Sequence, residues 1–156
     1  MVAEGMKKLR EMAMQDFAQR YPELRVGQYP KFKYSDRTAN GLTKAVLDFL
    51  RFSGWQAERI SVTGRPIDER VTYTDILGNV RQVGRIRWIK PNMQRGSADV
   101  SATIKGRSVK IEVKIGRDRQ SEVQKKYQRE VETAGGLYVI ATNFDEFYKW
   151  FQTAFK

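Results

Sequence analysis

Apolar residues recur three or four positions apart in four segments of the chain, which predicts four amphipathic helices. The apolar positions are Met6, Leu9, Ala13 and Phe17 in the first segment; Leu42, Ala45, Val46, Phe49 and Leu50 in the second; Val123, Tyr127, Val131 and Ala134 in the third; and Phe147, Trp150, Phe151, Ala154 and Phe155 in the fourth. Pro22 ends the first helix. We expect Asn40 to cap the start of the second helix and Gly54 its end, while Gly135 and Gly136 close the third.

Extended, β-rich segments lie between these helices. Residues 55–62 predict a strand that the Gly-Arg-Pro of residues 64–66 breaks, and residues 137–141 predict a buried strand. Residues 70–90 contain two extended runs on either side of Leu77-Gly78-Asn79, where Gly and Asn favour a turn. This pattern predicts a basic β-hairpin arm.

Residues 99–104 and 109–114, separated by Lys105-Gly106-Arg107-Ser108, predict a second hairpin. If Lys105-Gly106 is a two-residue turn, Ile104 pairs with Arg107, and the register places Asp99 opposite Glu112. The same register gathers apolar residues on one face and leaves polar residues on the other. The apolar face is Val100, Ala102, Val109 and Ile111, and the polar face is Asp99, Ser101, Lys110, Glu112 and Lys114.

The order of these elements predicts an α/β fold, with a mixed β-sheet flanked by helices. We expect a single domain over residues 1–156. Its parts are an N-terminal helix and basic loop at 1–38, a core at 40–141 and a closing helix at 142–156.

The charge of the chain indicates a polyanionic partner. Lys and Arg number 29 against 18 acidic residues, which gives a formal net charge of +11 and a pI near 10.0. The basic residues are clustered within 81–95 and 105–129, which favours nucleic-acid binding over a merely solubilising surface. No apolar run is long enough to span a membrane, and the N-terminus lacks a signal-peptide core, so we expect a cytoplasmic protein.

The absence of Cys and His limits the chemistry that the chain can perform. Thiolate and imidazole ligands, bases and nucleophiles are excluded, which leaves carboxylates, lysine and hydroxyls. Two carboxylates facing each other across a hairpin repel, and a divalent cation is a reason to bring them together. The simpler alternative is that Glu112 and Lys114 face solvent on an ordinary amphipathic strand and that Asp99 only marks a strand entry.

The segment Gly96-Ser97-Ala98-Asp99, followed twelve residues later by Glu112-Val113-Lys114, resembles the PD-(D/E)xK nuclease superfamily. The downstream Gln120-Ser121, Gln124 and Gly135-Gly136 look more narrowly like its VRR-NUC branch, which is close to Holliday-junction resolvases. The resemblance covers residues 40–141 and implies a restriction-endonuclease-like fold.

The resemblance also implies roles for individual residues. Asp99, Glu112 and the carbonyl of Val113 would bind Mg²⁺ or Mn²⁺, and Lys114 would be the catalytic lysine. Gln124 would orient the active site or the scissile phosphate. A local alternative, compatible with that role, is that Ser121 and Gln124 form a capping box.

Other positions are candidates for contact with the substrate. Asn40 stands where the family often carries a glutamate, and Lys44 where a glutamine is common, so either could make a different contact from the first core helix. Arg117 and Arg119 could grip phosphates or could be solvated loop charges. The further candidates for nucleic-acid binding are Ser97, Arg85, Arg87 and Arg95.

We therefore expect a metal-dependent endonuclease that hydrolyses phosphodiester bonds in DNA, with a preference for branched, flap or junction structures as one form of that activity. An RNA substrate stays open. One alternative is a nucleic-acid-binding module that has lost catalysis, and another is a basic protein-interaction domain. The resemblance and the apolar face of the first helix also suggest a homodimer, although that face could instead pack on its own domain.

Overall fold

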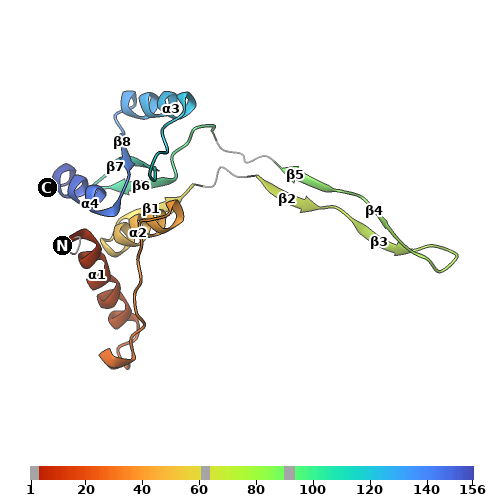
Figure 1. Ribbon diagram of the computed structural model, residues 1–156, viewed down its shortest axis with the longest axis horizontal. Helices are drawn as coiled ribbons and strands as arrows, with labels where there is room; N and C mark the ends of the chain where they lie inside the picture. The colour runs from red at the N-terminus through yellow and green to blue at the C-terminus, as the bar shows by residue number, and fades with distance from the viewer. Residues whose placement is uncertain (1–3, 61–63, 90–93) are drawn as a thin grey trace. The chain divides into compact units, whose positions relative to one another are not determined.

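The structure is a computed structural model that describes residues 4–60, 64–89 and 94–156. Its contacts divide the chain into two compact units, which we call the core unit (residues 1–60 and 96–156) and the arm unit (residues 61–95). The sequence predicted a single domain over residues 1–156. Figure 1 shows the helices and strands of both units.

A four-stranded mixed sheet forms the centre of the core unit. Its strands are β1 (Gln56–Arg59), β6 (Val100–Ile104), β7 (Arg107–Val113) and β8 (Leu137–Ala141), in the order β1-β6-β7-β8. The first two pairings are antiparallel, and β8 runs parallel to β7. The prediction of an α/β fold with a mixed sheet flanked by helices is confirmed.

Helices cover the sheet of the core unit on both faces (Figure 1). They are α1 (Glu4–Arg20), α2 (Ala39–Phe52), α3 (Glu122–Thr133) and α4 (Phe144–Ala154), with a short 3₁₀ helix, η1 (Val26–Gln28), after α1. Helices α2 and α4 pack on one face, and α1 packs against both of them. Helix α3 contacts β8 and reaches the polar face of β7 through a contact between Gln124 and Glu112.

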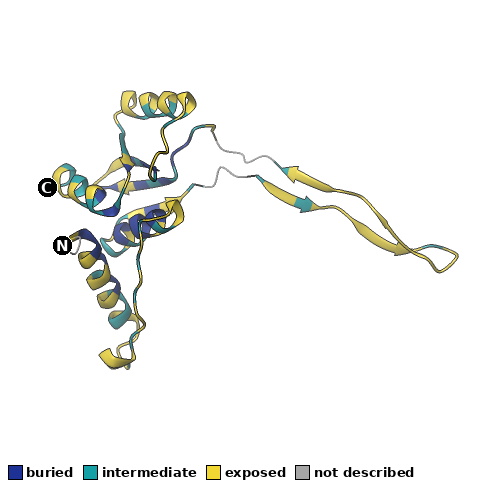
Figure 2. Cartoon of the chain, viewed as in Figure 1, coloured by how far each residue is buried: buried dark blue, intermediate teal, exposed yellow. Residues whose placement is uncertain are grey.

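The hydrophobic core lies between the sheet and helices α2 and α4 (Figure 2). Strand β6 contributes Val100 and Ile104, while α4 contributes Phe144 and Phe147, which are 0% and 1% exposed. Helix α1 buries Met6, Leu9 and Ala13 within the same chain. The apolar face of α1 therefore packs on its own domain, which was one of its two expected roles.

The predicted caps are correct for α3, whereas the predicted cap at the start of α2 is wrong. Thr38, rather than Asn40, caps α2, because its side-chain oxygen accepts from the backbone N–H of Gly41 at 3.1 Å. The first turn of α2 is mostly exposed, so the apolar pattern began too late to locate it. Ser53 is the C-cap of α2, and Gly54 follows it with φ of +81°, a conformation that favours glycine.

Two predicted strands differ from the observed ones. Strand β1 covers Gln56–Arg59 of the predicted 55–62, of which Ser61 and Val62 lie outside the described residues. Strand β8 has the predicted bounds but is only half-buried, since Ile140 is 40% exposed on the α3 side.

The arm unit is a hairpin of four short strands. They are β2 (Arg65–Asp68), β3 (Val71–Thr74), β4 (Val80–Val83) and β5 (Ile86–Ile89), and β2 pairs with β5 while β3 pairs with β4. The predicted hairpin and its turn are confirmed, although Lys90 lies outside the described residues. The predicted break is present at Gly64, which lies in no strand, but Arg65 and Pro66 belong to β2, where Pro66 pairs with Trp88. A two-stranded ladder has only edge strands, where proline is tolerated.

Candidate active site

The hairpin of β6 and β7 has the register predicted from the sequence. Ile104 pairs with Arg107, and Val100 pairs with Ile111. Lys105 and Gly106 adopt φ of 48° and 75°, the left-handed pair that a two-residue hairpin turn requires. The polar face is confirmed by Lys110, whose Nζ donates to Ser101 Oγ at 2.6 Å.

Asp99 lies immediately before β6 and turns its carboxylate toward β7. The backbone N–H of Val113 donates to Asp99 Oδ2 at 2.8 Å. The N–H and C=O of one strand residue point to the same side of the strand, so the carbonyl of Val113 faces the same edge as Asp99. Two of the three proposed metal ligands therefore share one edge of β7.

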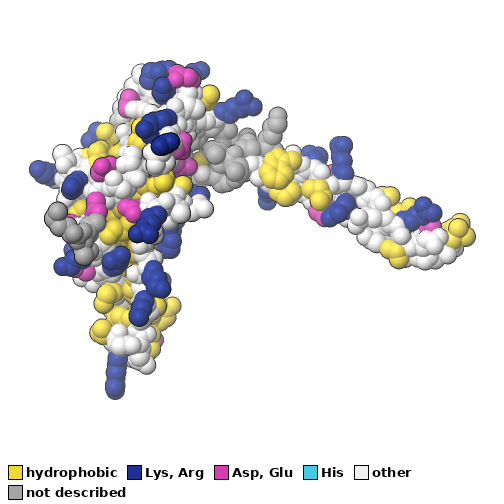
Figure 3. Space-filling model, viewed as in Figure 1, with side chains coloured by type: hydrophobic (Ala, Val, Ile, Leu, Met, Phe, Trp, Pro, Cys, Tyr) yellow, Lys and Arg dark blue, Asp and Glu magenta, His cyan; other side chains and the backbone are white. Residues whose placement is uncertain are grey.

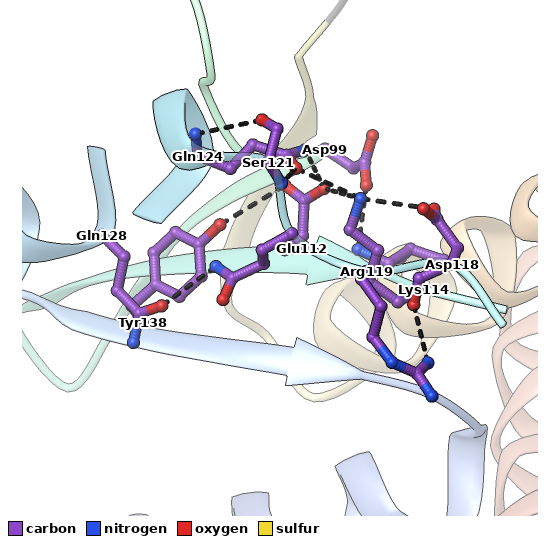
Figure 4. A network of polar contacts seen from close by, with 11 residues as sticks. Asp99, Glu112, Lys114, Asp118, Arg119, Ser121, Gln124, Gln128 and Tyr138 are labelled. Carbon is purple, nitrogen blue, oxygen red and sulfur yellow. Dashed lines mark hydrogen bonds and ion pairs between the residues drawn. The ribbon is translucent and has the colours of Figure 1, made fainter. Parts of the chain in front are cut away.

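Glu112 is a buried carboxylate, 2% exposed, at the centre of a polar network (Figure 4). Its Oε1 accepts a short hydrogen bond from Gln124 Nε2 and lies 3.2 Å from Lys114 Nζ. Burial and, second, the negative charge of Asp99 raise the pKa of Glu112, and these effects exceed the opposing effect of Lys114. The two carboxylates are thus close enough to repel.

Lys114 is buried as well, with 9% of its surface exposed. Its Nζ lies 3.2 Å from Glu112 Oε1, from Asp118 Oδ2 and from Gln124 Oε1. Burial by itself would lower the pKa of Lys114, but the interactions with Glu112 and Asp118 outweigh burial and raise it. Lys114 is therefore a fixed cation beside Glu112, and the alternative that both residues simply face solvent is wrong.

Gln124 takes part both in the helix cap and in the polar network. Ser121 Oγ accepts from the backbone N–H of Gln124 at 3.3 Å, and Gln124 Oε1 accepts from the Ser121 N–H at 2.9 Å, which completes the capping box. The same side chain contacts Glu112 and Lys114. One residue thus couples the start of α3 to the buried ion pair.

Tyr138 belongs to this network and was missed in the sequence analysis. Its hydroxyl donates to Glu112 Oε2 at 3.4 Å, and burial and the charge of Glu112 raise its pKa. Gln120 also hydrogen-bonds to Tyr138 and donates to Gln128 at 2.9 Å. Tyr138 lies opposite Lys110 in the parallel pairing of β8 with β7. This long-range pairing brings it near Glu112, and no local pattern in the sequence indicates it.

The residues at this edge fit a hard divalent cation. Asp99, Glu112 and the Val113 carbonyl offer oxygen donors, which are the ligands that Mg²⁺ and Mn²⁺ prefer. Asp99 raises the pKa of Glu112, and a shared cation would reverse that repulsion. Across residues 4–60, 64–89 and 94–156, no group of three or more Asp and Glu side chains is placed to hold a metal. Mg²⁺ sites commonly use one or two carboxylates, with water and substrate phosphate completing the shell.

A cavity of about 400 Å³ opens beside Lys114. Its lining residues are Lys114, Asp118, Arg119, Gln120, Lys125, Ile140 and Thr142. The Arg119 side chain donates to the backbone carbonyls of Gly116 and Asp118 at 3.3 and 3.0 Å, so it lies against the loop that contains it. Arg117 is exposed in the same loop. The cavity therefore joins the buried cation to a basic surface that suits a phosphate.

Three other candidates have different surroundings. Ser97 is buried and shares a hydrogen bond with Tyr127 of α3. Asn40 accepts from Arg59 at 2.7 Å. Lys44 forms an ion pair with Asp48, and within the described residues no contact joins Asn40 or Lys44 to Glu112.

The remaining arginine candidates belong to the arm unit. Arg87 pairs with Glu69 at 2.8 Å, while Arg85 and Arg95 are exposed. No helix within the described part of the chain has the length and apolar character needed to cross a membrane. The comparisons with known proteins add nothing to these observations: no protein-family model matches the chain, and no curated protein is significantly similar to it.

Proposed function

We propose that the core unit is a metal-dependent endonuclease that hydrolyses phosphodiester bonds in DNA. One observation carries this proposal. The buried carboxylate of Glu112 lies near the carboxylate of Asp99, and the buried ammonium of Lys114 lies 3.2 Å from it. Burying one carboxylate beside a second costs folding stability, and a protein that keeps such a costly arrangement often uses it for catalysis.

Each residue of the candidate site would have a different role in hydrolysis. Asp99, Glu112 and the Val113 carbonyl would hold Mg²⁺ or Mn²⁺, which supplies Lewis-acid activation of water and of the phosphoryl oxygen when bound. Lys114 has a raised pKa and stays protonated, so it would stabilise negative charge on the phosphoryl group rather than accept a proton. Gln124 and Tyr138 would orient Glu112.

The cavity beside Lys114 would receive the phosphate that undergoes hydrolysis. Arg119 and Lys125 line it, and both are cationic. Positive charge around a phosphate lowers the cost of bringing the polyanion toward two carboxylates. A more specific version of this proposal is that the enzyme prefers branched, flap or junction DNA.

Cleavage of labelled DNA tests the proposal. Single-stranded, duplex, flap and four-way-junction substrates are incubated with the wild-type chain and Mg²⁺, Mn²⁺ or EDTA. We expect metal-dependent cutting that falls on the order of 100-fold or more in Glu112→Gln and in Lys114→Ala. Glu58→Gln and Lys149→Ala change the same residue types at exposed positions and should cut normally.

The same variants separate metal binding from catalysis. Mg²⁺ should raise the melting temperature of the wild-type chain through linkage, and it should raise that of Glu112→Gln much less. A folded wild-type chain that binds DNA but cuts none of the substrates with either metal would refute the enzyme proposal.

A second candidate function is DNA binding without catalysis. It is favoured by the position of Lys114 and Gln124, which both already contact Glu112 Oε1. If these contacts persist in the presence of metal, the carboxylate is a structural ion-pair partner. Mg²⁺ would then leave the melting temperature of the wild-type chain unchanged.

A further inference from the structure

The arm, which we define as residues 64–89, is one hairpin with a single register. Arg65 pairs with Ile89 in the ladder of β2 and β5, and Val71 pairs with Val83 in the ladder of β3 and β4, without any shift between the ladders. Successive strand residues point to opposite faces. The odd-numbered residues of both strands therefore share one face, and the even-numbered residues share the other.

Side-chain contacts confirm this division. Glu69 and Arg87 form an ion pair at 2.8 Å across the odd face. On the even face, Gln82 donates to Thr72 at 3.5 Å, and Arg70 pairs with its strand neighbour Asp68 at 2.6 Å.

The two faces differ in charge. Four of the five arginines of the arm lie on the odd face. Arg65, Arg81 and Arg87 lie within the two ladders, and Arg85 lies opposite Glu69, whose backbone N–H donates to the Arg85 carbonyl at 3.1 Å. Arg81 and Arg87 are paired with Asp75 and Glu69, whereas no ion pair with a described residue engages Arg65 or Arg85. The only arginine of the even face, Arg70, is neutralised by Asp68. The odd face is thus positively charged, and the even face is neutral.

The arm has no core of its own. None of its residues is buried, and large apolar side chains lie exposed along it, interspersed with arginines (Figure 3). These are Val71, Tyr73, Ile76, Leu77, Val80, Val83, Ile86 and Trp88, with exposures from 45% to 102%. A lone two-stranded hairpin is at best marginally stable in water, so a partner that covers one of its faces would stabilise the arm.

The charge and shape of the odd face select the kind of partner. Four arginines match a polyanion, and a two-stranded ribbon fits the major groove of B-form DNA. Double-stranded RNA presents a deep and narrow major groove that excludes such a ribbon. A second copy of the arm, placed symmetrically on the same face, would oppose like charges.

We infer that the arm is a docking element for duplex DNA and that it binds through its odd-numbered face, with Arg65 and Arg85 supplying phosphate contacts. Val71, Tyr73 and Val83 lie on the same face, farther along the hairpin toward its turn than Arg85. This binding surface is distinct from the residues proposed for hydrolysis and does not depend on them.

Equilibrium binding of the full chain to a fluorescent duplex, measured in EDTA over a range of salt concentrations, tests the inference. The variants are Arg85→Gln, the double variant Arg65→Gln/Arg85→Gln, and Arg70→Gln as the matched loss of one charge from the even face. We expect the double variant to bind at least about tenfold more weakly, with a salt slope reduced by about 0.9 for each lost phosphate contact. Arg70→Gln should keep the wild-type affinity and slope.

Three outcomes would overturn the inference. One is equal affinity for Arg85→Gln, the double variant and Arg70→Gln; another is binding of duplex RNA as tightly as duplex DNA. The third is self-association of the wild-type chain that Arg65→Gln/Arg85→Gln abolishes, with no duplex binding. Because the measurement uses EDTA, a chain that binds through Arg65 and Arg85 without ever cutting would sustain the inference while refuting the proposed nuclease.

Discussion

At the scale of single residues, Glu112 is the member of the candidate site that most reduces the folding stability of the metal-free chain. Burial and the charge of Asp99 raise its pKa even though Lys114 lies 3.2 Å away. A group whose folded pKa is raised contributes stability that is present below its unfolded pKa, about 4.3 for glutamate, and that is lost as the pH rises through the folded pKa. The ionised Glu112 therefore destabilises the metal-free fold at neutral pH.

This sign predicts that Glu112→Gln is more stable than the wild-type chain in EDTA. At pH 8 the variant should melt at a higher temperature than the wild-type chain, because it removes the buried charge that Asp99 repels. The difference should shrink as the pH falls toward 4, where the wild-type carboxyl is protonated. Thermal melts across this pH range measure it, and Glu58→Gln should show no such trend. A variant that melts below wild type at pH 8 would contradict the direction of the pKa shift.

At the scale of secondary-structure elements, helix α3 links stability to the site. Ser121 caps the helix and Gln124 completes the capping box, yet Gln124 also contacts Glu112. A lost cap costs about 1 kcal/mol in a typical helix. Here the loss of the Ser121 hydroxyl would also remove its hydrogen bond with the backbone N–H of Gln124, the residue that contacts Glu112.

We therefore predict that Ser121→Ala lowers both stability and cleavage. The melting temperature should fall by roughly 2–4 °C, and the cleavage rate by severalfold at a temperature where the variant is folded. Asn143→Ala is the matched control, because Asn143 caps α4 by accepting from the Glu146 N–H at 2.9 Å, away from the polar network. It should lose similar stability and keep its activity. Equal losses of activity in both variants would mean that the cap acts only through global stability.

Local patterns predicted most of these elements correctly. The hairpin of β6 and β7 was predicted in its observed register, because a two-residue turn and the alternation of apolar residues select the same pairing. The cap of α2 was misplaced, since the exposed first turn carries no apolar signal. The role of Tyr138 depends on the parallel pairing of β8 with β7, which joins residues far apart in the sequence and leaves no local pattern. Pro66 was misassigned because proline usually interrupts a strand, and only the two-stranded ladder makes its place tolerable.

At the scale of the whole molecule, burial is divided unequally between the two units. Every buried residue among those described belongs to the core unit, including the largest fully buried side chains, Phe144 and Phe147. The net charge of +11, by contrast, is shared by both units. A variant that lacks the arm should therefore lose affinity for a polyanion without losing the stability of the core unit.

Replacement of residues 65–89 by a short Gly-Ser linker tests this separation. We expect the shortened chain to melt within roughly 3 °C of the full chain, because it loses no buried side chain and because loop-closure entropy changes only slowly with loop length. Any stabilisation by Mg²⁺ should persist, since Asp99, Glu112 and Lys114 all lie in the core unit. Affinity for duplex DNA should fall, with a shallower dependence on salt. Circular-dichroism melts and duplex binding measure the two effects. A fall in melting temperature of more than roughly 10 °C would mean that the arm supports the fold of the core unit, because a loss of that size exceeds what an unburied hairpin contributes.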